Sequence, residues 1–240
     1  MACTPPEILP LAFSDSAAGT ADCAVQWRRS ARARRVSLRI DARLGAVVVT
    51  LPPRAGRRQG MALLATHAGW VAARLAALAP HVPLAEGETV MVGGAPHVIR
   101  QHPAPAGEAC LEAGALLVPG PLGELPHRTA AWLRAEALRR IATLVAGHGT
   151  RLAVAPAGIV LKDTRSRWGS CAPDRRLAFS WRLVMAPAWV LDYVVAHEVA
   201  HLRELNHSPR FWTLVEQLTP HRAAAVAWLK AHGPGLLRVG

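Results

Sequence analysis

The sequence is poor in the residues that would build a disulfide scaffold or a cysteine-ligated metal site. Its 240 residues include four cysteines, and these are widely spaced without any CxxC pair. This spacing argues against a disulfide framework and against a zinc knuckle. Unpaired cysteines are the usual pattern in proteins from a reducing compartment. We therefore predict a cytoplasmic protein.

Long apolar segments and targeting signals are also missing. No window of eighteen residues is both apolar and free of charge, which argues against a transmembrane helix. The opening segment, MACTPPEILPLAFSDSAAG, lacks a basic region and is interrupted by prolines, so it does not resemble a signal peptide. Its composition predicts a disordered leader over residues 1–22. With 51% hydrophobic residues, the chain has ample material for a globular core.

Lysine is nearly absent, although the formal net charge is +12: Lys162 and Lys230 are the only lysines. Ten arginines lie between Arg28 and Arg58, against the single acidic residue Asp41. Such a strip could bind a phosphate backbone or steer an acidic substrate. Alternatively, arginine simply fills the polar positions of half-exposed strands. The charge permits nucleic acid as a partner but does not favour it, because no aromatic interleaving or known binding motif accompanies it.

Residues 23–121 show the pattern of a β-rich subdomain that contains one helix. The alternating segment RRVSLRI and the run AVVVTL predict the two strands of a hairpin. Helical periodicity follows over residues 57–78 and stops before Pro80. Within residues 84–120, the segments TVMVGGAPHVIRQH and ACLEAGALLVPG each resemble a hairpin with a glycine-containing turn.

Residues 122–240 are predicted to form a second, mostly helical subdomain. A long helix is expected from about residue 125 to the sequence GHG, which should end it at Gly147. The segments GIVLKD and LAFSWRLV look like the strands of a further hairpin, joined by the connection TRSRWGSCAPDRR. Three helical segments follow, each opened by a proline that a first helical turn tolerates: near Pro187, Pro209 and Pro220.

The segment VAHEVAHLRELNH, residues 195–207, places three histidines and two glutamates on and just after a predicted helix over 187–205. His197 and His201 are four residues apart, so their rings project from one face of the helix. Glu198 is displaced around the helix, where its carboxylate can reach a metal-bound water without being a ligand. This is the HExxH arrangement, in which two imidazoles bind zinc and the glutamate acts as general base.

A bare HExxH can also be an ordinary surface helix, so the neighbouring residues matter. Two histidines and a glutamate inside an apolar helix are costly to bury unless they engage a metal or one another. His207 supplies the third imidazole that a catalytic zinc requires. Asn206 as helix stop and Ser208-Pro209 as helix start predict a turn that carries His207 back toward the pair. The alternative third ligand is Glu216 on the following helix.

The connection RWGSC is predicted to be a bulged hairpin whose Trp168 packs against the core, or else one wall of an active cleft. In the second interpretation, Arg165 or Arg167 stabilises an oxyanion or binds a phosphate. Cys171 is not expected to be a nucleophile, because no separate base is evident and a hydroxide on zinc would already supply the nucleophile.

Two further side chains lie close to the motif. Tyr193 precedes His197 by four residues and either donates its hydroxyl to the transition state or packs. Glu204 either orients a ligand ring or pairs with a neighbouring arginine at the surface.

These segments resemble the YgjP-like metallopeptidase family, relatives of the SprT and WLM zinc metalloproteases. The resemblance rests on HEVAHLRELNHSPRFW, TRSRWGSC, LAFSWRLVMAP and VLDYVV, and on RRSARARRVSLRI, VVVTLPPRA and HAGWVAARL nearer the N-terminus. It implies a zinc-dependent hydrolase with His197, His201 and His207 as ligands and Glu198 as general base. The HExxHxxxxxH spacing is shared with the metzincins, but Glu204 stands where those enzymes have glycine.

Together the patterns predict an α+β protein: a β-rich N-terminal half with a helix, and a zincin-like catalytic half with a β-hairpin and an HExxH helix. We predict a metallopeptidase in which one zinc-bound water, activated by Glu198, hydrolyses peptide bonds. One alternative is a metal-dependent nucleoside triphosphate hydrolase with arginines as phosphate clamps. The other is a DNA-associated protease with a nucleic-acid-binding N-terminal half. Substrate, oligomeric state and the choice among zinc, cobalt, nickel and manganese are not specified by the sequence.

Overall fold

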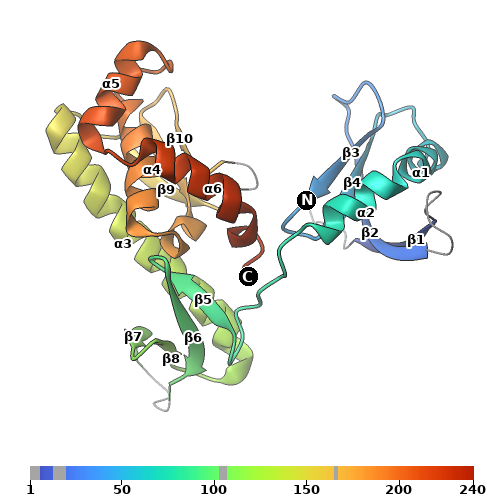
Figure 1. The fold of residues 1–240 in the computed structure, drawn as a ribbon, viewed down its shortest axis with the longest axis horizontal. Coiled ribbons are helices and arrows are strands. Elements are labelled where there is room, and N and C mark those ends of the chain that lie inside the picture. Colours follow the sequence, from blue (N-terminus) through green and yellow to red (C-terminus); the bar gives the residue numbers. More distant parts are fainter. Residues whose placement is uncertain (1–5, 13–19, 103–106, 165–166) are drawn as a thin grey trace. The chain divides into compact units, whose positions relative to one another are not determined.

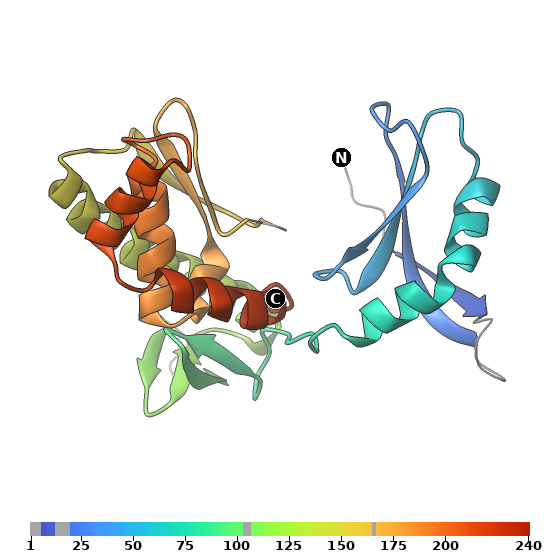
Figure 2. The same cartoon turned by 45° about the horizontal axis from the view of Figure 1, so that its top comes forward.

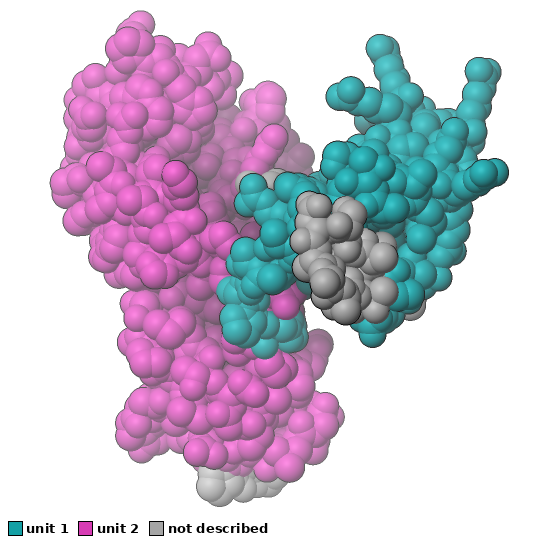
Figure 3. Space-filling model, turned by 45° about the vertical axis from the view of Figure 1, so that its right-hand side comes forward, with its two compact units in different colours: residues 1–81 teal, residues 82–240 magenta. Residues whose placement is uncertain are grey.

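The computed structural model describes residues 6–12, 20–102, 107–164 and 167–240. The chain divides into two compact units, residues 1–81 and 82–240, which Figure 3 shows in different colours. This division differs from the boundary expected between residues 121 and 122. Strands from residues 89–118 share one apolar core with the helices that follow, so they belong to the second unit.

The first unit is a four-stranded sheet covered by two short helices (Figure 1). Its core consists of β-branched strand residues and helix residues, such as Val47, Val49, Leu64 and Val71. In sheet order the strands are β1 (Glu7–Ala12), β2 (Thr20–Arg29), β4 (Ala46–Leu51) and β3 (Ser37–Asp41), and the helices are α1 (Arg57–Thr66) and α2 (Ala68–Ala76).

Most expectations for this unit hold, with two differences. The hairpin of β3 and β4 is confirmed, since the two strands pair antiparallel. The helix expected over residues 57–78 is instead two helices that meet at His67. The disordered leader predicted over residues 1–22 is wrong for Glu7–Ala12, which pairs with β2 as an edge strand. Residues 1–5 and 13–19 lie outside the described residues.

The second unit begins with another four-stranded sheet, seen at one end of α3 in Figures 1 and 2. Both predicted hairpins are confirmed, and a parallel pair between β6 and β8 joins them. In sheet order the strands are β5 (Thr89–Val92), β6 (Ala95–Gln101), β8 (Ala115–Val118) and β7 (Cys110–Glu112).

A long helix, α3 (Leu125–Leu152), follows the short 3-10 turn η1 (Leu122–Glu124). The prediction that GHG ends this helix at Gly147 is wrong. Packing of α3 against α4 and η2 outweighs the roughly 1 kcal/mol that each helical glycine costs. The helix ends instead at Ala153, which adopts the left-handed conformation with φ 50°.

The strands β9 (Gly158–Lys162), β10 (Gly169–Cys171) and β11 (Arg176–Ser180) form a small sheet in the order β10-β11-β9. The predicted hairpin of GIVLKD with LAFSWRLV is wrong, because β9 and β11 pair in parallel. The hairpin is formed by β10 and β11, with Gly169 opposite Phe179. A connection of thirteen residues, 163–175, is long enough to return to the start of the sheet and make a parallel neighbour. The last three residues of RWGSC, Gly169–Cys171, thus form an edge strand.

The remaining elements are η2 (Trp181–Met185), α4 (Ala188–Ala200), α5 (Pro209–Leu218) and α6 (Arg222–Leu236). Helix α4 contacts α3, α5, α6 and β10. Nine of its thirteen residues are buried, so it is a central helix that is enclosed nearly all round. Side chains carried by such a helix are held rigidly by packing. None of the helices in the described ranges combines the length and apolar character needed to cross a membrane.

A buried arginine of the second unit, Arg182, forms an ion pair with Asp163. Arg182 is 1% exposed, and it also donates to the backbone carbonyl of Val239 at 2.9 Å and stacks over the ring of Trp181. We expect Arg182→Ala to lower the free energy of unfolding by about 3–5 kcal/mol, because it leaves buried polar partners unsatisfied. Denaturant titration measures the change. The control, Arg176→Ala, removes an exposed pair with Asp174 and should cost at most about 1 kcal/mol. Equal losses in both variants would contradict the prediction.

Candidate metal centre and active site

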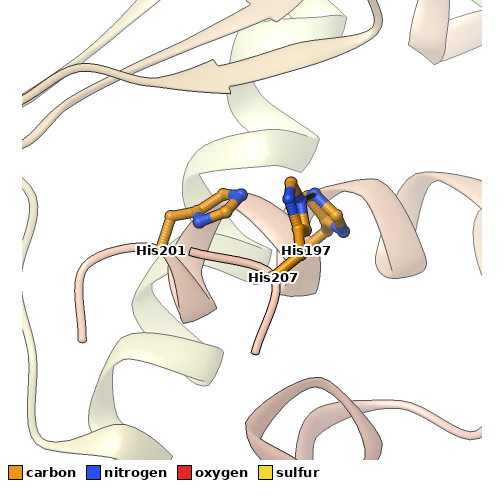
Figure 4. Close-up of side chains that lie close together, drawn as sticks. All are labelled: His197, His201 and His207. Carbon is orange, nitrogen blue, oxygen red and sulfur yellow. Dashed lines mark hydrogen bonds between the residues drawn. The ribbon is translucent and has the colours of Figure 1, made fainter. Parts of the chain in front are cut away.

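Three histidine rings meet at the C-terminal end of α4 (Figure 4). His197 lies in the last turn of the helix, His201 is its C-cap residue, and His207 lies on the segment before α5. One ring nitrogen from each lies within 4.8 Å of the other two. The ring centroids are 4.8–5.1 Å apart. The structure therefore brings together the three residues that the sequence predicts as metal ligands.

The donor atoms suit a small cation. Nε2 of His207 lies 3.1 Å from Nε2 of His197, close to the edge of about 3.3 Å expected for a tetrahedron with metal–nitrogen bonds of about 2.0–2.1 Å. Nδ1 of His201 lies 3.0 Å from the carbonyl oxygen of Glu204, to which it donates, so Nε2 keeps its lone pair. Nδ1 of His197 is buried without a hydrogen-bond partner among the described residues. A three-imidazole zinc site is compatible with all of these contacts.

Burial keeps these rings in the form that binds metals. It lowers the pKa of His197 to about 4, with smaller contributions from the charges of His201, His207 and Arg222. Burial also lowers the pKa of His201, partly offset by the bond to the Glu204 carbonyl. Neutral imidazoles are the ligand form, so no proton has to be displaced from His197 near neutral pH.

Aromatic residues at the start of α5 hold the three rings, and the sequence motifs did not reveal them. Phe211 is fully buried and stacks on His201 with ring centroids 4.4 Å apart. Trp212 stacks on His207 at 5.6 Å. The sequence feature that could have predicted this contact is the spacing, because Phe211 follows His207 by four residues, across the predicted start of a helix.

The chain turns sharply between His201 and α5, in a way that the sequence predicted only in part. Ser208 caps α5 by accepting a hydrogen bond from the backbone nitrogen of Phe211, as expected. However, α4 ends at Ala200 rather than at residue 205, and the N–H groups of Leu202 and Arg203 bond three residues back instead of four. The backbone carbonyl of Glu204, rather than its carboxylate, orients His201.

The alternative third ligand, Glu216, is not part of this cluster. Its side chain is 66% exposed and forms an ion pair with Arg222 at 3.6 Å. The geometry therefore favours His207.

Glu198 lies in the same helical turn as His197 and is 6% exposed. Burial raises the pKa of its carboxyl to about 7, while the charge of Arg167 acts in the opposite direction. Glu198 also lies against Gly169 of β10. A Cβ atom added at Gly169 would be 2.5 Å from Oε1 and 2.6 Å from Cγ of Glu198. The glycine of RWGSC is therefore needed for space beside the glutamate.

We expect Gly169→Ala to displace the Glu198 carboxylate and to lower kcat by about tenfold or more, because small misplacements of a catalytic group are costly. Turnover and denaturant stability should be measured together, since the lost activity should exceed what unfolding explains. Gly158→Ala in β9 is the matched control, because nothing lies within 4 Å of the added Cβ. Full activity in Gly169→Ala would contradict this role for the glycine.

The other predicted site residues fall into distinct places. Arg167 lines a cavity together with Glu198 and His197. Tyr193 is buried, lines the same cavity and places its ring 6.0 Å from that of His197. Burial raises the pKa of the Tyr193 hydroxyl, which keeps it protonated and able to donate. Arg165 lies outside the described residues.

Two further residues of the RWGSC segment have structural roles. Trp168 is partly buried against the main core, and it also lines the cavity that contains His197 and Glu198. Burial raises the pKa of the Cys171 thiol, with the charge of Glu198 as a further cause. A protonated thiol is a poor nucleophile, which agrees with the expectation that Cys171 takes no part in covalent chemistry.

Three imidazoles close to a buried glutamate are the groups from which metal-dependent hydrolytic sites are built. A family model for the YgjP-like metallopeptidase domain matches residues 34–232. The chain belongs to the YgjP-like metallopeptidase family, and the match includes residues from both compact units.

No curated protein matches the chain. Among solved structures, the chain is similar to the metallopeptidase zymogen abylysin of Pyrococcus abyssi, with 20% sequence identity and a TM-score of 0.33. That likeness covers 36% of this chain and 87% of the other.

Proposed function

We propose that the protein is a zinc-dependent peptidase that uses His197, His201 and His207 as ligands and Glu198 as general base. The observation that carries the proposal is the meeting of three imidazole nitrogens within 4.8 Å, one of them from His197, which lines a cavity together with the buried Glu198. Three histidines with one open position are a ligand set of catalytic zinc sites. Membership in a metallopeptidase family supports peptides as substrates.

Zinc at this position would supply an acidified water and polarise the substrate carbonyl. Glu198 accepts a proton from the attacking water at its carboxylate and delivers it to the leaving amine. A pKa of about 7 suits both steps, since the group takes up and releases a proton near neutral pH. Gly169 keeps the carboxylate in place, and Tyr193 provides a hydroxyl at the wall of the cavity.

The test compares peptide and nucleotide substrates with one preparation of the full-length protein. We expect about one zinc ion per chain, cleavage of a casein-like substrate, loss of cleavage with a chelator and its return with added zinc. A nucleotide hydrolase would instead release phosphate or pyrophosphate from nucleoside triphosphates and leave the protein substrate intact. That outcome would replace the peptidase proposal.

One observation favours a second role for the first unit. Nine of the ten arginines between Arg28 and Arg58 are exposed, whereas Arg43 is half-buried. Exposed arginines in this number can neutralise the phosphates of a nucleic acid backbone. A mobility shift that weakens steeply with salt would support a DNA-associated protease. Absence of binding at low salt would remove this role and leave the peptidase proposal unaffected.

A further inference from the structure

The cavity beside Glu198 has an apolar end. Its volume is about 310 Å³, at the lower end of the range for ligand pockets. Glu198 and His197 line this cavity together with the apolar side chains of Trp168, Val226 and Leu229. Helix α4 contacts both β10 and α6, and Figure 1 shows these elements in the same part of the second unit.

One face of α6 builds the wall. Arg222, Val226, Leu229 and Gly233 follow one another at intervals of four, three and four residues, which places them on one side of the helix. Val226 is 49% exposed, although it is apolar. A Cβ atom at Gly233 would be 2.9 Å from the ring of Trp168, so the glycine lets this ring lie against α6.

The two ends of the wall differ in chemistry. Arg222 lines a second cavity, of about 730 Å³, which shares Tyr193 and Val226 with the first. Its guanidinium stacks over Trp212 at 3.5 Å. The Arg222 guanidinium therefore belongs to the second cavity. Among the described residues that line the pocket next to Glu198, the charged ones are Glu198 itself and Arg167.

We infer that the pocket formed by Trp168, Val226 and Leu229 binds an apolar side chain of the substrate next to the bond that is cleaved. This inference rests on the proposed peptidase function and adds a substrate class to it. The pocket is continuous with the residues that would do the chemistry, so its occupant fixes the position of the scissile bond. A leucine or phenylalanine side chain removes apolar surface from water against Trp168, Val226 and Leu229, whereas burying a charged side chain against the same apolar groups is unfavourable.

The test profiles the metal-loaded full-length protein on a library of short peptides randomised around the cleavage point, with products read by mass spectrometry. We expect leucine or phenylalanine at one position to exceed glycine and aspartate by about tenfold or more in kcat/KM. Val226→Asp places a carboxylate in the pocket, so the preference should fall by a similar factor and shift toward lysine and arginine. Leu138→Asp on α3, another exposed apolar helix position, is the matched control and should keep the wild-type profile.

The outcomes separate the two proposals. A profile that Val226→Asp leaves unchanged, or a wild-type protein without any apolar preference, overturns the pocket and leaves the peptidase function standing. Failure to cleave every peptide overturns the peptidase function and the pocket together. Equal changes in Val226→Asp and Leu138→Asp would show a general effect on folding, and would also count against the pocket.

Discussion

Glu198→Gln is expected to lower kcat for peptide cleavage by about 10²–10⁴-fold, the range for losing a general acid–base group. Glutamine has almost the same shape but cannot accept a proton from the attacking water. It also removes a carboxyl whose burial is costly, as the raised pKa of Glu198 shows, so the variant should be at least as stable as the parent. Peptide turnover at saturating substrate, with zinc content measured on the same sample, checks both effects.

Glu204→Gln is the control for that substitution. Glu204 is six residues away and contributes its backbone carbonyl to His201, which the substitution leaves intact. Turnover should therefore stay close to the wild-type value. If Glu198→Gln retained full turnover with zinc bound, Glu198 would not be the general base.

The second large effect is expected for metal affinity. His207→Ala removes one of three ligands and should weaken zinc binding by about 100-fold or more, since loss of an outer-shell partner alone costs 10- to 100-fold. Because His207 is exposed, the metal-free variant should fold normally. A competition titration against a chromophoric chelator measures the affinity. At the same free zinc concentration, the stabilisation by zinc should fall by about 2.7 kcal/mol for a 100-fold loss.

Glu216→Ala distinguishes the two candidate third ligands. Glu216 is exposed and paired with Arg222, so its removal should leave zinc affinity unchanged. The opposite result, with affinity lost in Glu216→Ala and kept in His207→Ala, would show that the segment before α5 rearranges when the metal binds.

Local patterns in the sequence predicted the elements whose geometry is local. The hairpin of β3 and β4 follows from period-two alternation, and the cap at Ser208 follows from Ser-Pro before an apolar run. The approach of His197 and His201 follows from helical spacing. That His207 meets His197 and His201 depends on a turn. The flanking residues predict that a turn is present, but they do not determine the direction in which the chain leaves it.

Features that depend on distant segments were missed. Whether β9 and β11 pair parallel or antiparallel is decided by the path of the connection that contains β10, which pairs with β11 on the side away from β9. Both strands have the same alternation in either case. The close approach of Gly169 to Glu198 joins residues 29 positions apart. The orientation of His201 depends on a backbone carbonyl, and side-chain identity says nothing about such a group.

The segment from His201 to Ser208 has a consequence for how fast the protein exchanges its metal. Two of the three rings come from a helix end that is locked into the core, whereas His207 belongs to a short, largely exposed segment outside any helix or strand. Opening such a segment costs far less than unfolding the domain. We therefore expect metal to enter and leave when His207 moves away from the other two rings. The stacking of Trp212 on the His207 ring should control the rate of this movement.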